Sequence, residues 1–396
     1  MDGRARLMTL PVSRRTVVAG IAAGMATQAS GTGRVLRGGS MSGFAYVGCR
    51  TSRERNAKGD GISVYRIAAD GAWTRIQLVS DLINPSWLAF DRSRRFLYTA
   101  HGDGSEASAF RVDPATGELT FLNRVTTGGR NPVHLMADPT NRFMVVANHI
   151  VADGVKSGLS TLPIAADGSL GAPVDIVAFD GKIGPHRVEQ PFPKPHQVQF
   201  DPPGKFITVP DKGCDRVLVY RIDGGGKLHL VENGGAAARE TSGPRHVAFH
   251  PGSRFAYVIN ELDSTIVGYH FDPASGALRP FQVVSALADT FTGNSRGSEI
   301  AVSPDGRHVY ASNRGADTVA TFAVDGLSGR LTLTGSSPAG GKTPRFFTLT
   351  ADGSAMFVAN EEGHTIVRHA IDPRSGLPQK PVVIAETGSP TSILLS

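Results

Sequence analysis

The stretch GPRHVAFHPGSRFAYVINELDSTIVGYHFDPASGAL, residues 243–278, decides the fold. It contains three short segments in which apolar and polar residues alternate, and turns rich in Asp, Pro, Ser and Gly separate them. Such a pattern predicts three consecutive strands rather than an amphipathic helix. Arg245 and Glu261 stand at two of the joints between turn and strand, where turn residues would be expected.

The same pattern recurs along the chain from anchor residues that are 46 to 63 residues apart. The anchors are Pro85, Pro132, Pro195, Pro244, Gly297, Pro344 and Pro390. Sixteen residues after six of these anchors, a polar residue closes the second strand of the unit. These closing residues are His101, Asn148, Asp211, Asn260, Asn313 and Asn360. A constant internal register of this kind indicates a repeated structural unit.

Units of four strands and roughly 45 to 50 residues are typical of the blades of a β-propeller. The last unit, SPTSILLS at residues 389–396, supplies one strand, whereas FAYVGCR at residues 44–50 resembles a second strand whose first is missing. We expect the two termini to complete one blade together, which closes the ring and removes exposed sheet edges. The sequence therefore predicts an all-β, seven-bladed propeller over residues 43–396.

The N-terminal segment predicts export. Paired arginines, Arg14 and Arg15, precede an Ala- and Gly-rich stretch that ends in small residues, as in a twin-arginine signal peptide. We assign residues 1–31 to this signal and 32–42 to a linker, with a disordered basic tail as the alternative. The apolar stretch is too short to be a stable membrane span. A periplasmic or secreted protein follows from this assignment.

The formal charge of +6 lies almost entirely in the first forty residues, where six arginines face one aspartate. The predicted propeller is close to neutral, which argues against a nucleic-acid partner. Two cysteines, Cys49 and Cys214, exclude a disulfide framework but leave open whether they pair with each other.

The repeat also predicts where side chains gather. The start of the first strand and the loop after the second strand lie on one face of the disc, beside the central channel. Positions one and seventeen residues after the anchors should therefore surround one mouth of that channel. The first set is Ser86, Val133, His196, Arg245, Ser298, Arg345 and Thr391. The second set is Gly102, His149, Lys212, Glu261, Arg314 and Glu361.

Chemically capable side chains concentrate in the third to fifth units, as His196, Arg245, Glu261 and Arg314. Asp211 and Lys212 fall in the same set of loops. A purely structural alternative exists, because Arg345 and Glu361 repeat the spacing of Arg245 and Glu261 and both pairs would then be salt bridges that decorate the repeat.

Three segments resemble the lactonase family of seven-bladed propellers, which includes bacterial 6-phosphogluconolactonases and fungal carboxymuconate cycloisomerases. They are KPHQVQFDPPGKFITVPDKGCDRVLVYRID (194–223), GPRHVAFHPGSRFAYVINEL (243–262) and EIAVSPDGRHVYASNRGADTVATF (299–322). The resemblance covers nearly all of the chain after the signal. It implies an active site formed by His196 in PHQV, Arg245 in GPRH, Glu261 in NEL and Arg314 in SNRG, the residues that the repeat register also selects.

These side chains suit the opening of a lactone, which needs a base to activate water, a group to stabilise the oxyanion and a proton for the leaving alkoxide. His196 is the candidate base, because the ordinary pKa of imidazole lies near neutral pH. Arg245 and Arg314 would hold carboxylate or phosphate oxygens or the oxyanion. Glu261 would orient an arginine or act as the acid or base partner.

Other residues are weaker candidates. We expect Asp211, Lys212, Arg296 and Lys194 to contact substrate, and His186 and Lys194 lie in the longest insertion between units, where they could cover the mouth. His246 and His250 are interpreted as packing or turn residues. The histidines show no metal-binding motif, so we expect no metal and no cofactor. A divalent cation held by Asp211, Asn260, Glu261 and Asn313 is the alternative.

The sequence thus predicts an exported, metal-independent lactone hydrolase that acts on a small lactone or carboxylate substrate as a monomer or weak dimer. Export favours a sugar lactone without phosphate, because 6-phosphogluconolactone belongs to cytoplasmic metabolism. A cycloisomerase of muconate-type acids and a non-catalytic binding propeller are the two alternatives.

Overall fold

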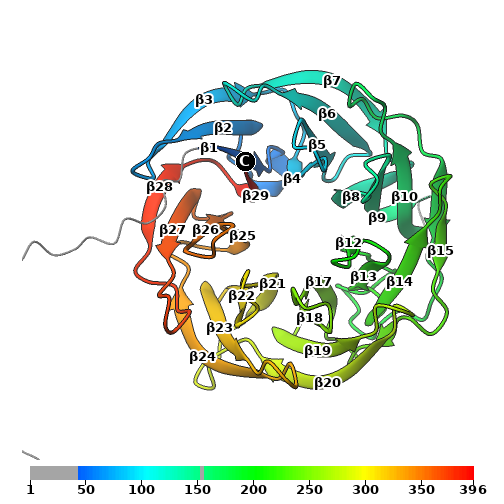
Figure 1. Cartoon of the computed structure of the whole chain (residues 1–396), viewed down its shortest axis with the longest axis vertical. Coiled ribbons are helices and arrows are strands. Elements are labelled where there is room, and N and C mark those ends of the chain that lie inside the picture. Colours follow the sequence, from blue (N-terminus) through cyan, green and yellow to red (C-terminus); the bar gives the residue numbers. More distant parts are fainter. Residues whose placement is uncertain (1–42, 152–155) are drawn as a thin grey trace, which may run out of the picture. The chain divides into compact units, whose positions relative to one another are not determined.

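Seven antiparallel sheets are arranged in a ring around a central axis (Figure 1). The computed structural model describes residues 43–151 and 156–396, so the predicted signal peptide and linker lie outside the described residues. Within the described ranges, the structure is built from strands and one short 3-10 turn, η1 (Arg53–Arg55). The prediction of an all-β, seven-bladed propeller is confirmed.

Each blade contains four main strands, ordered from the channel outward. Blade one is β4 (Pro85–Phe90), β5 (Phe96–His101), β6 (Glu106–Val112) and β7 (Leu119–Thr126). Blade two is β8 (Gly129–Ala137), β9 (Phe143–Val151), β10 (Lys156–Pro163) and β11 (Asp175–Ala178). Blade three is β12 (Gln199–Phe200), β13 (Ile207–Asp211), β14 (Arg216–Ile222) and β15 (Leu228–Leu230), and β16 (Ala236–Ala237) also pairs with β14.

The remaining blades follow the same order. Blade four is β17 (Pro244–Phe249), β18 (Phe255–Asn260), β19 (Thr265–Phe271) and β20 (Leu278–Ser285). Blade five is β21 (Arg296–Val302), β22 (His308–Arg314), β23 (Thr318–Val324) and β24 (Leu331–Pro338). Blade six is β25 (Pro344–Leu349), β26 (Ala355–Asn360), β27 (Thr365–Ala370) and β28 (Val382–Glu386). Blade seven is β29 (Pro390–Leu395), β1 (Gly43–Cys49), β2 (Ile62–Ile67) and β3 (Trp73–Val79).

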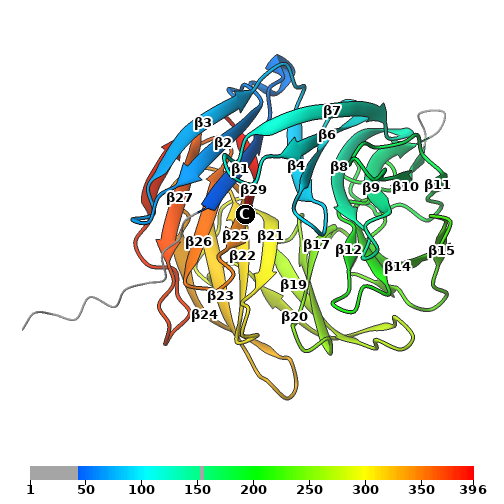
Figure 2. The same ribbon diagram turned by 45° about the horizontal axis from the view of Figure 1, so that its top comes forward.

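Blade seven closes the ring as the sequence predicted. The C-terminal strand β29 pairs antiparallel with β1, and Tyr46 lies opposite Leu394. The backbone N–H of Ser396 donates to the carbonyl of Phe44 at 2.9 Å. Because β29 and β1 are hydrogen-bonded to each other, the two ends of the chain complete one blade and the ring is closed without an unpaired inner strand (Figure 2).

The sixteen-residue register of the repeat is the pairing register of the first two strands. Each anchor lies opposite the polar residue that closes the second strand. The pairs are Pro85 with His101, Pro132 with Asn148, Pro195 with Asp211, Pro244 with Asn260, Gly297 with Asn313 and Pro344 with Asn360. The repeated asparagines are structural: the amide of Asn313, for example, donates to the carbonyl of Ala286 at 2.7 Å.

A repeated tyrosine ties neighbouring blades together. Buried hydroxyls of four second-strand tyrosines donate to the carbonyl of a turn glycine in the next blade, at 2.8 to 3.0 Å. The pairs are Tyr46 with Gly117, Tyr98 with Gly168, Tyr257 with Gly329 and Tyr310 with Gly376. Each of these glycines has a positive φ, a conformation that glycine adopts without steric cost. The apolar core lies between blades, and these hydrogen bonds satisfy the four tyrosine hydroxyls that are buried in it.

Blade three departs from the regular pattern. Its inner strand β12 has two residues, and Pro195 makes an isolated bridge with Asp211. Backbone contacts replace the missing ladder, because the N–H of His196 donates to the carbonyl of Pro210 and that of Lys212 donates to the carbonyl of Lys194. Three prolines in the segment 191–195 remove donors from this part of the chain and shorten the strand.

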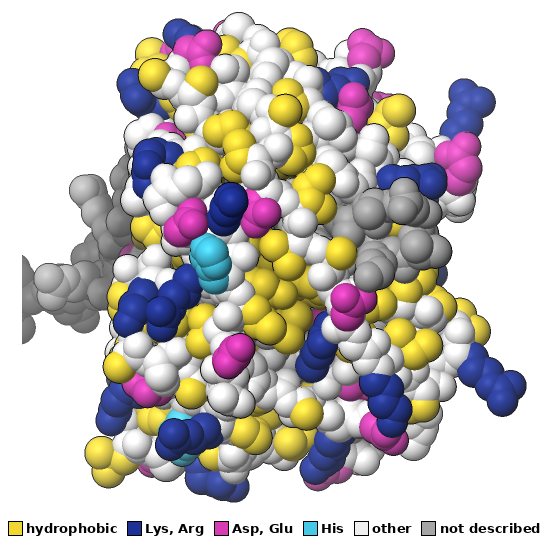
Figure 3. Space-filling view, turned by 90° about the vertical axis from the view of Figure 1, so that its right-hand side faces the viewer, with side chains coloured by type: hydrophobic (Ala, Val, Ile, Leu, Met, Phe, Trp, Pro, Cys, Tyr) yellow, Lys and Arg dark blue, Asp and Glu magenta, His cyan; other side chains and the backbone are white. Residues whose placement is uncertain are grey.

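The side of the molecule that faces the viewer in Figure 3 carries acidic and basic side chains interspersed with apolar ones. This mixture agrees with the near-neutral charge expected for the propeller. In the described part of the chain, no helix is long and apolar enough to cross a membrane.

Candidate active site

The first and second strands bring the predicted side chains to one mouth of the channel, here called the charged mouth. It is formed by residues one and seventeen positions after the anchors, together with the insertion that precedes blade three. Glu261 is the centre of this arrangement. Its side chain is 5% exposed, and its backbone N–H donates to the carbonyl of Gly243 at 2.7 Å, which fixes the loop after β18.

Four cationic side chains surround the Glu261 carboxylate. The distances are 2.7 Å to Lys212 Nζ, 3.1 Å to Arg245 Nε, 3.3 Å to Arg314 Nη2 and 3.6 Å to Arg296 Nη1. Burial by itself would raise the pKa of Glu261, but the neighbouring cations lower it well below its usual range. Glu261 is therefore a carboxylate at neutral pH and holds the cations in place.

Arg245, on the inner strand β17, is the most buried of these cations. Its side chain is 3% exposed, and its Nη1 donates to the carbonyl of Ser298 on the next inner strand at 2.8 Å. Burial, with Arg314 and Arg345 close by, lowers the pKa of Arg245 to about 9. The guanidinium is thus pre-oriented between two blades and stays charged at neutral pH.

His196 lies beside Arg245 and is almost fully buried. Its ring centroid is 5.6 Å from that of His149 and 5.2 Å from that of His246. Burial and the nearby Arg245 lower the pKa of His196 well below the ordinary value, so the imidazole is neutral at pH 7. Among the described residues, His196 Nδ1 has no hydrogen-bond partner.

Arg314 and Arg296 are the cations at this mouth with free donor capacity. Arg314 Nη2 donates to the carbonyl of Gly297 at 3.0 Å, but its buried Nε has no partner within the described ranges. Arg296 is 41% exposed and contacts Glu189 at 2.7 Å. An unpaired buried N–H is unfavourable, so the Nε–H of Arg314 is available to donate to an oxygen of a ligand.

The other predicted contact residues divide into two groups. Lys212 and Lys194 reach the mouth: Lys212 Nζ lies 2.9 Å from the Glu189 carboxylate, and Lys194 Nζ donates to the Glu189 carbonyl at 2.9 Å. Asp211 is fully buried and accepts from the backbone N–H groups of Lys194 and Gly213. These contacts, with an ion pair to Arg216 at 3.3 Å, make Asp211 a residue that shapes the loop.

The insertion before blade three contributes one residue that the sequence did not single out. Glu189 pairs with both Lys212 and Arg296. Nearby cations lower the pKa of Glu189 to about 2, against the opposing effect of its partial burial. His186 of the same insertion is exposed, and its Nδ1 accepts from the backbone N–H groups of Val188 and Glu189. His186 is thus a turn residue rather than a cover for the mouth.

A second ion-pair group continues the charged mouth around the ring. Glu361 pairs with Arg345 at 3.3 Å and with Arg50 at 3.0 Å, and Arg50 also reaches Asp103 at 3.2 Å. Arg50 directly follows Cys49, which pairs with the anchor Pro390, so it occupies the seventeenth position of blade seven. The repeat register could have identified Arg50, had it been continued across the ring closure.

The two cysteines and the histidines His246 and His250 also have defined surroundings. Cys49 and Cys214 are both free thiols, so they do not form a disulfide. Cys49 lies at the end of β1 and not in a loop, and its thiol donates to the carbonyl of Gly61 at 2.8 Å. His246 is fully buried in the channel and contacts Glu299, whereas His250 caps the turn after β17.

Cationic side chains outnumber carboxylates at this mouth, and several of the cations share one carboxylate. The cations are Arg50, Lys194, Lys212, Arg245, Arg296, Arg314 and Arg345, and the carboxylates are Asp103, Glu189, Glu261 and Glu361. A site with this balance attracts an anion or a group that becomes anionic during reaction. The neutral imidazole of His196 lies next to these cations, and its Nδ1 has no partner among the described residues.

Comparison with known proteins identifies the family to which this fold belongs. The model of the family described as "Lactonase, 7-bladed beta-propeller" matches residues 44–395. A 6-phosphogluconolactonase of Bacillus subtilis is 36% identical over 340 residues, which are 84% of this chain and 92% of that protein.

Solved structures are similar over nearly the same range. The periplasmic gluconolactonase PpgL of Pseudomonas aeruginosa has a TM-score of 0.82 and 30% identity, and the match covers 89% of this chain and 99% of PpgL. A putative 6-phosphogluconolactonase of Bacteroides fragilis has a TM-score of 0.78 and 28% identity, with coverage of 90% and 98%.

Proposed function

The chain belongs to the lactonase family of seven-bladed β-propellers, and from this premise we propose that it hydrolyses a sugar lactone outside the cytoplasm without a metal ion. It is a 6-phosphogluconolactonase-like lactonase, an enzyme that opens lactone rings. The catalytic assignment, the substrate, the export and the independence from metal are the proposed parts.

One observation carries the catalytic assignment. A neutral, buried imidazole with a free Nδ1 (His196) adjoins a buried arginine (Arg245), and the same mouth holds the unpaired Nε of Arg314. A proton acceptor and fixed cationic donors are the groups that lactone hydrolysis needs. A binding scaffold has no need to bury a base beside an arginine.

The reaction follows from these positions. His196 Nδ1 takes a proton from a water molecule as the water oxygen attacks the lactone carbonyl carbon. Arg245 and Arg314 stabilise the negative charge that develops on the carbonyl oxygen. When the ring C–O bond breaks, the imidazolium returns its proton to the leaving alkoxide, which gives a hydroxy acid.

The depressed pKa of His196 suits the second half of the reaction, in which the imidazolium gives up its proton. Arg245 disfavours the imidazolium form, so the proton that His196 acquires is readily passed on to the alkoxide. Glu261 does not contact the reacting atoms in this scheme. It acts as a positioning residue, because its carboxylate holds Arg245 and Arg314 on one side and Lys212 on the other.

The charge distribution argues against the divalent-cation alternative. Glu261 is surrounded by four cations, and the Asp211 carboxylate is occupied by N–H donors and Arg216. A divalent cation would have to displace these groups and enter a region of positive potential. We therefore assign the oxyanion stabilisation to arginines.

Two features support an exported enzyme that acts on a lactone without phosphate. Arg14 and Arg15 stand before an Ala- and Gly-rich stretch in the pattern of a twin-arginine signal. The structurally similar PpgL is named a periplasmic gluconolactonase. Arg296 at the mouth is 41% exposed and could contact a phosphate group, so the phosphorylated lactone belongs in the same test.

The test is hydrolysis of a lactone panel that includes gluconolactone and 6-phosphogluconolactone, with and without a chelator and after subtraction of spontaneous opening. His196→Ala should lower kcat by at least about 100-fold, the usual contribution of a general base. His229→Ala is the matched control, because His229 is 59% exposed on the outside of blade three.

Turnover that survives chelation and is lost in His196→Ala supports the proposal. Loss of turnover on chelation, or equal rates for His196→Ala and His229→Ala, contradicts it. If a folded wild type opens none of the lactones, a muconate-type acid should be tested next, because cycloisomerisation makes the same C–O bond in reverse.

A further inference from the structure

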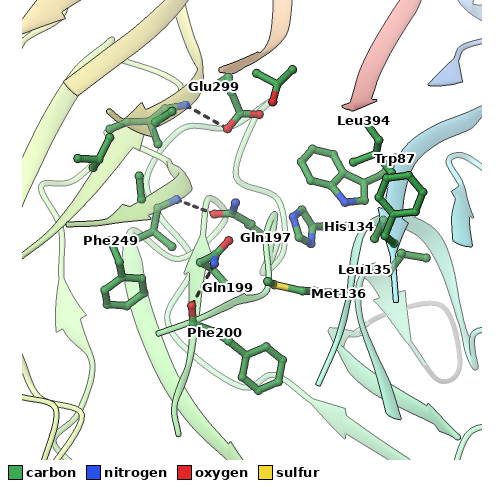
Figure 4. Close-up of a pocket in the computed structure, with 18 of the residues that line it drawn as sticks. Trp87, His134, Leu135, Met136, Gln197, Gln199, Phe200, Phe249, Glu299 and Leu394 are labelled. Atoms are coloured by element: carbon green, nitrogen blue, oxygen red, sulfur yellow. Dashed lines mark hydrogen bonds between the residues drawn. The ribbon is translucent and has the colours of Figure 1, made fainter. Parts of the chain in front are cut away.

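The channel holds a second compartment on the side away from the charged mouth, here called the lower cavity (Figure 4). Its volume is about 640 Å³. Its walls come from the later residues of the inner strands, such as Trp87–Phe90 of β4, and from the turn Asp201–Gly204 between the first two strands of blade three. Turns between the first and second strands lie on the face opposite the charged mouth.

A layer of rings separates the two compartments. The Trp87 ring lies 4.0 Å from the His134 ring and 5.5 Å from those of His246 and Phe346. His246 in turn lies 5.2 Å from His196 at the charged mouth. The lower cavity is thus next to the candidate active site but is not part of it.

Most side chains that line the lower cavity are apolar, and several polar side chains line it as well. Trp87, Met136, Phe200, Phe249 and other apolar side chains line it (Figure 4). The polar side chains include His134, Gln197, Gln199 and Glu299, and the side chain of Glu299 is 7% exposed. A volume of this size with apolar walls and few polar groups is typical of a small-molecule site.

The two oxygens of Glu299 differ in their surroundings. Oε1 lies 2.9 Å from His246 Nδ1 and accepts from the backbone N–H of Ile300 at 3.1 Å. Oε2 has no hydrogen-bond partner among the described residues. A buried oxygen without a partner costs free energy, which a ligand could recover.

We propose that the lower cavity binds a small, uncharged, ring-containing molecule, and that an oxygen of this molecule accepts a hydrogen bond from the Glu299 carboxyl group. The mainly apolar walls select a ring, and the Glu299 carboxyl group orients it. An anion would lose its hydration against the mainly apolar walls, and the lining residues Arg92 and Asp201 carry opposite charges, so we expect the cavity to prefer an uncharged molecule.

The ionisation of Glu299 agrees with this role as a donor. Burial raises the pKa of Glu299 to about 8, although Arg245 acts in the opposite direction. The group is therefore a neutral carboxylic acid at pH 7. Oε1 is next to His246 Nδ1 and accepts from the N–H of Ile300, whereas Oε2 has no partner among the described residues, so in our proposal the proton is on Oε2 and is donated to the ligand.

The probe for this site is 2-naphthol, a neutral two-ring molecule with one hydroxyl, measured by isothermal titration calorimetry at pH 7. Naphthalene-2-sulfonate has the same rings and a negative charge, and serves as the matched control ligand. We expect 2-naphthol to bind with a dissociation constant below about 1 mM, as a fragment of its size can. The sulfonate should bind at least tenfold more weakly.

Three variants locate the bound probe. Glu299→Leu should weaken binding of 2-naphthol at least tenfold, whereas Glu299→Gln keeps an N–H donor and should stay within about threefold. Gln199→Phe places a ring in the cavity, leaves Glu299 in place and should abolish binding. This variant tests the site even if Glu299→Leu does not fold. Arg296→Ala alters the charged mouth and should leave binding unchanged.

Absence of binding to the wild type would mean that the lower cavity holds water only, and would overturn the proposal. Equal binding of the sulfonate, or loss of binding in Arg296→Ala, would place the probe at the charged mouth and would also overturn it. Unchanged binding of 2-naphthol to Gln199→Phe would also overturn the proposal.

Discussion

Replacing Glu261 by glutamine tests the central element of the charged mouth. The amide keeps the shape of the side chain but removes the charge shared by Lys212, Arg245, Arg314 and Arg296. Removing one partner of a buried ion pair usually costs about 3–5 kcal/mol, because the remaining charge stays buried. Lys212 and Arg296 keep Glu189 as a partner. We therefore expect the lower end of that range, about 3 kcal/mol.

The expected shift in melting temperature follows from the size of the propeller. The entropy of unfolding is about 2.1 cal/mol/K per residue, or about 0.7 kcal/mol/K for roughly 350 residues. A loss of about 3 kcal/mol then lowers Tm by about 4 °C. Phosphate should recover part of this loss in Glu261→Gln, because an anion can bind the cations that the carboxylate has left.

The matched control is Glu361→Gln. Glu361 occupies the same position of blade six, but it contacts two arginines and is 15% exposed. Its replacement should cost about 1–2 kcal/mol, since partly exposed pairs are screened by water. The comparison is made by thermal unfolding followed by circular dichroism at pH 7, at low and moderate phosphate.

The pH dependence of Tm is a second, independent test of the role of Glu261. The pKa of Glu261 is depressed, so its contribution is present above the unfolded value of about 4.3 and is lost as the pH falls through the folded value. The difference in Tm between wild type and Glu261→Gln should therefore narrow below about pH 4. A Tm for Glu261→Gln within about 1 °C of the wild type at pH 7 would refute the idea that this carboxylate holds the cations together.

The remaining predictions concern Glu299, the cysteines and the N-terminus. Glu299 faces His246 and Arg245, and its pKa is raised to about 8. The free energy of unfolding of the wild type should therefore fall, relative to that of Glu299→Gln, by up to about 1.4 kcal/mol per pH unit between about pH 4.3 and 8. If urea unfolding gives the same difference in free energy between the two proteins at pH 5 and at pH 8, this expectation is wrong. Burial raises the pKa of Cys49 to about 11 and of Cys214 to about 12, so a thiol reagent at pH 7.5 should react slowly with the folded protein and rapidly with both thiols after unfolding. Replacing Arg14 and Arg15 by lysine should retain the protein in the cytoplasm, as judged by fractionation of the producing cell, and unchanged export would exclude the twin-arginine route.

The repeat made most of the fold predictable. Each anchor pairs with the residue sixteen positions after it, so the first two strands of a blade form a local hairpin. The register of a hairpin depends on residues that are close in sequence. The same register placed Arg245, Glu261 and Arg314 at one mouth, since residues at equal positions of equal blades lie on one face. Closure of the ring by β29 and β1 followed from the incomplete units at the two ends.

Long-range contacts account for what the sequence did not reveal. Glu189 reaches Lys212 and Arg296 through an irregular insertion, whose path has no periodicity from which a position could be inferred. Asp211 obeys the register, yet its carboxylate turns into the loop because backbone N–H groups and Arg216 lie there.

The sequence by itself therefore determined the number of blades, their order and the presence of Arg245, Glu261 and Arg314 at the charged mouth, because these depend on a local pattern that is repeated around the ring. The tertiary structure alone decided which carboxylate each cation meets, how strongly burial shifts the pKa of His196 and Glu299, and where the lower cavity lies. Burial and pairing are properties of side chains that several blades bring together, and no single repeat contains that information.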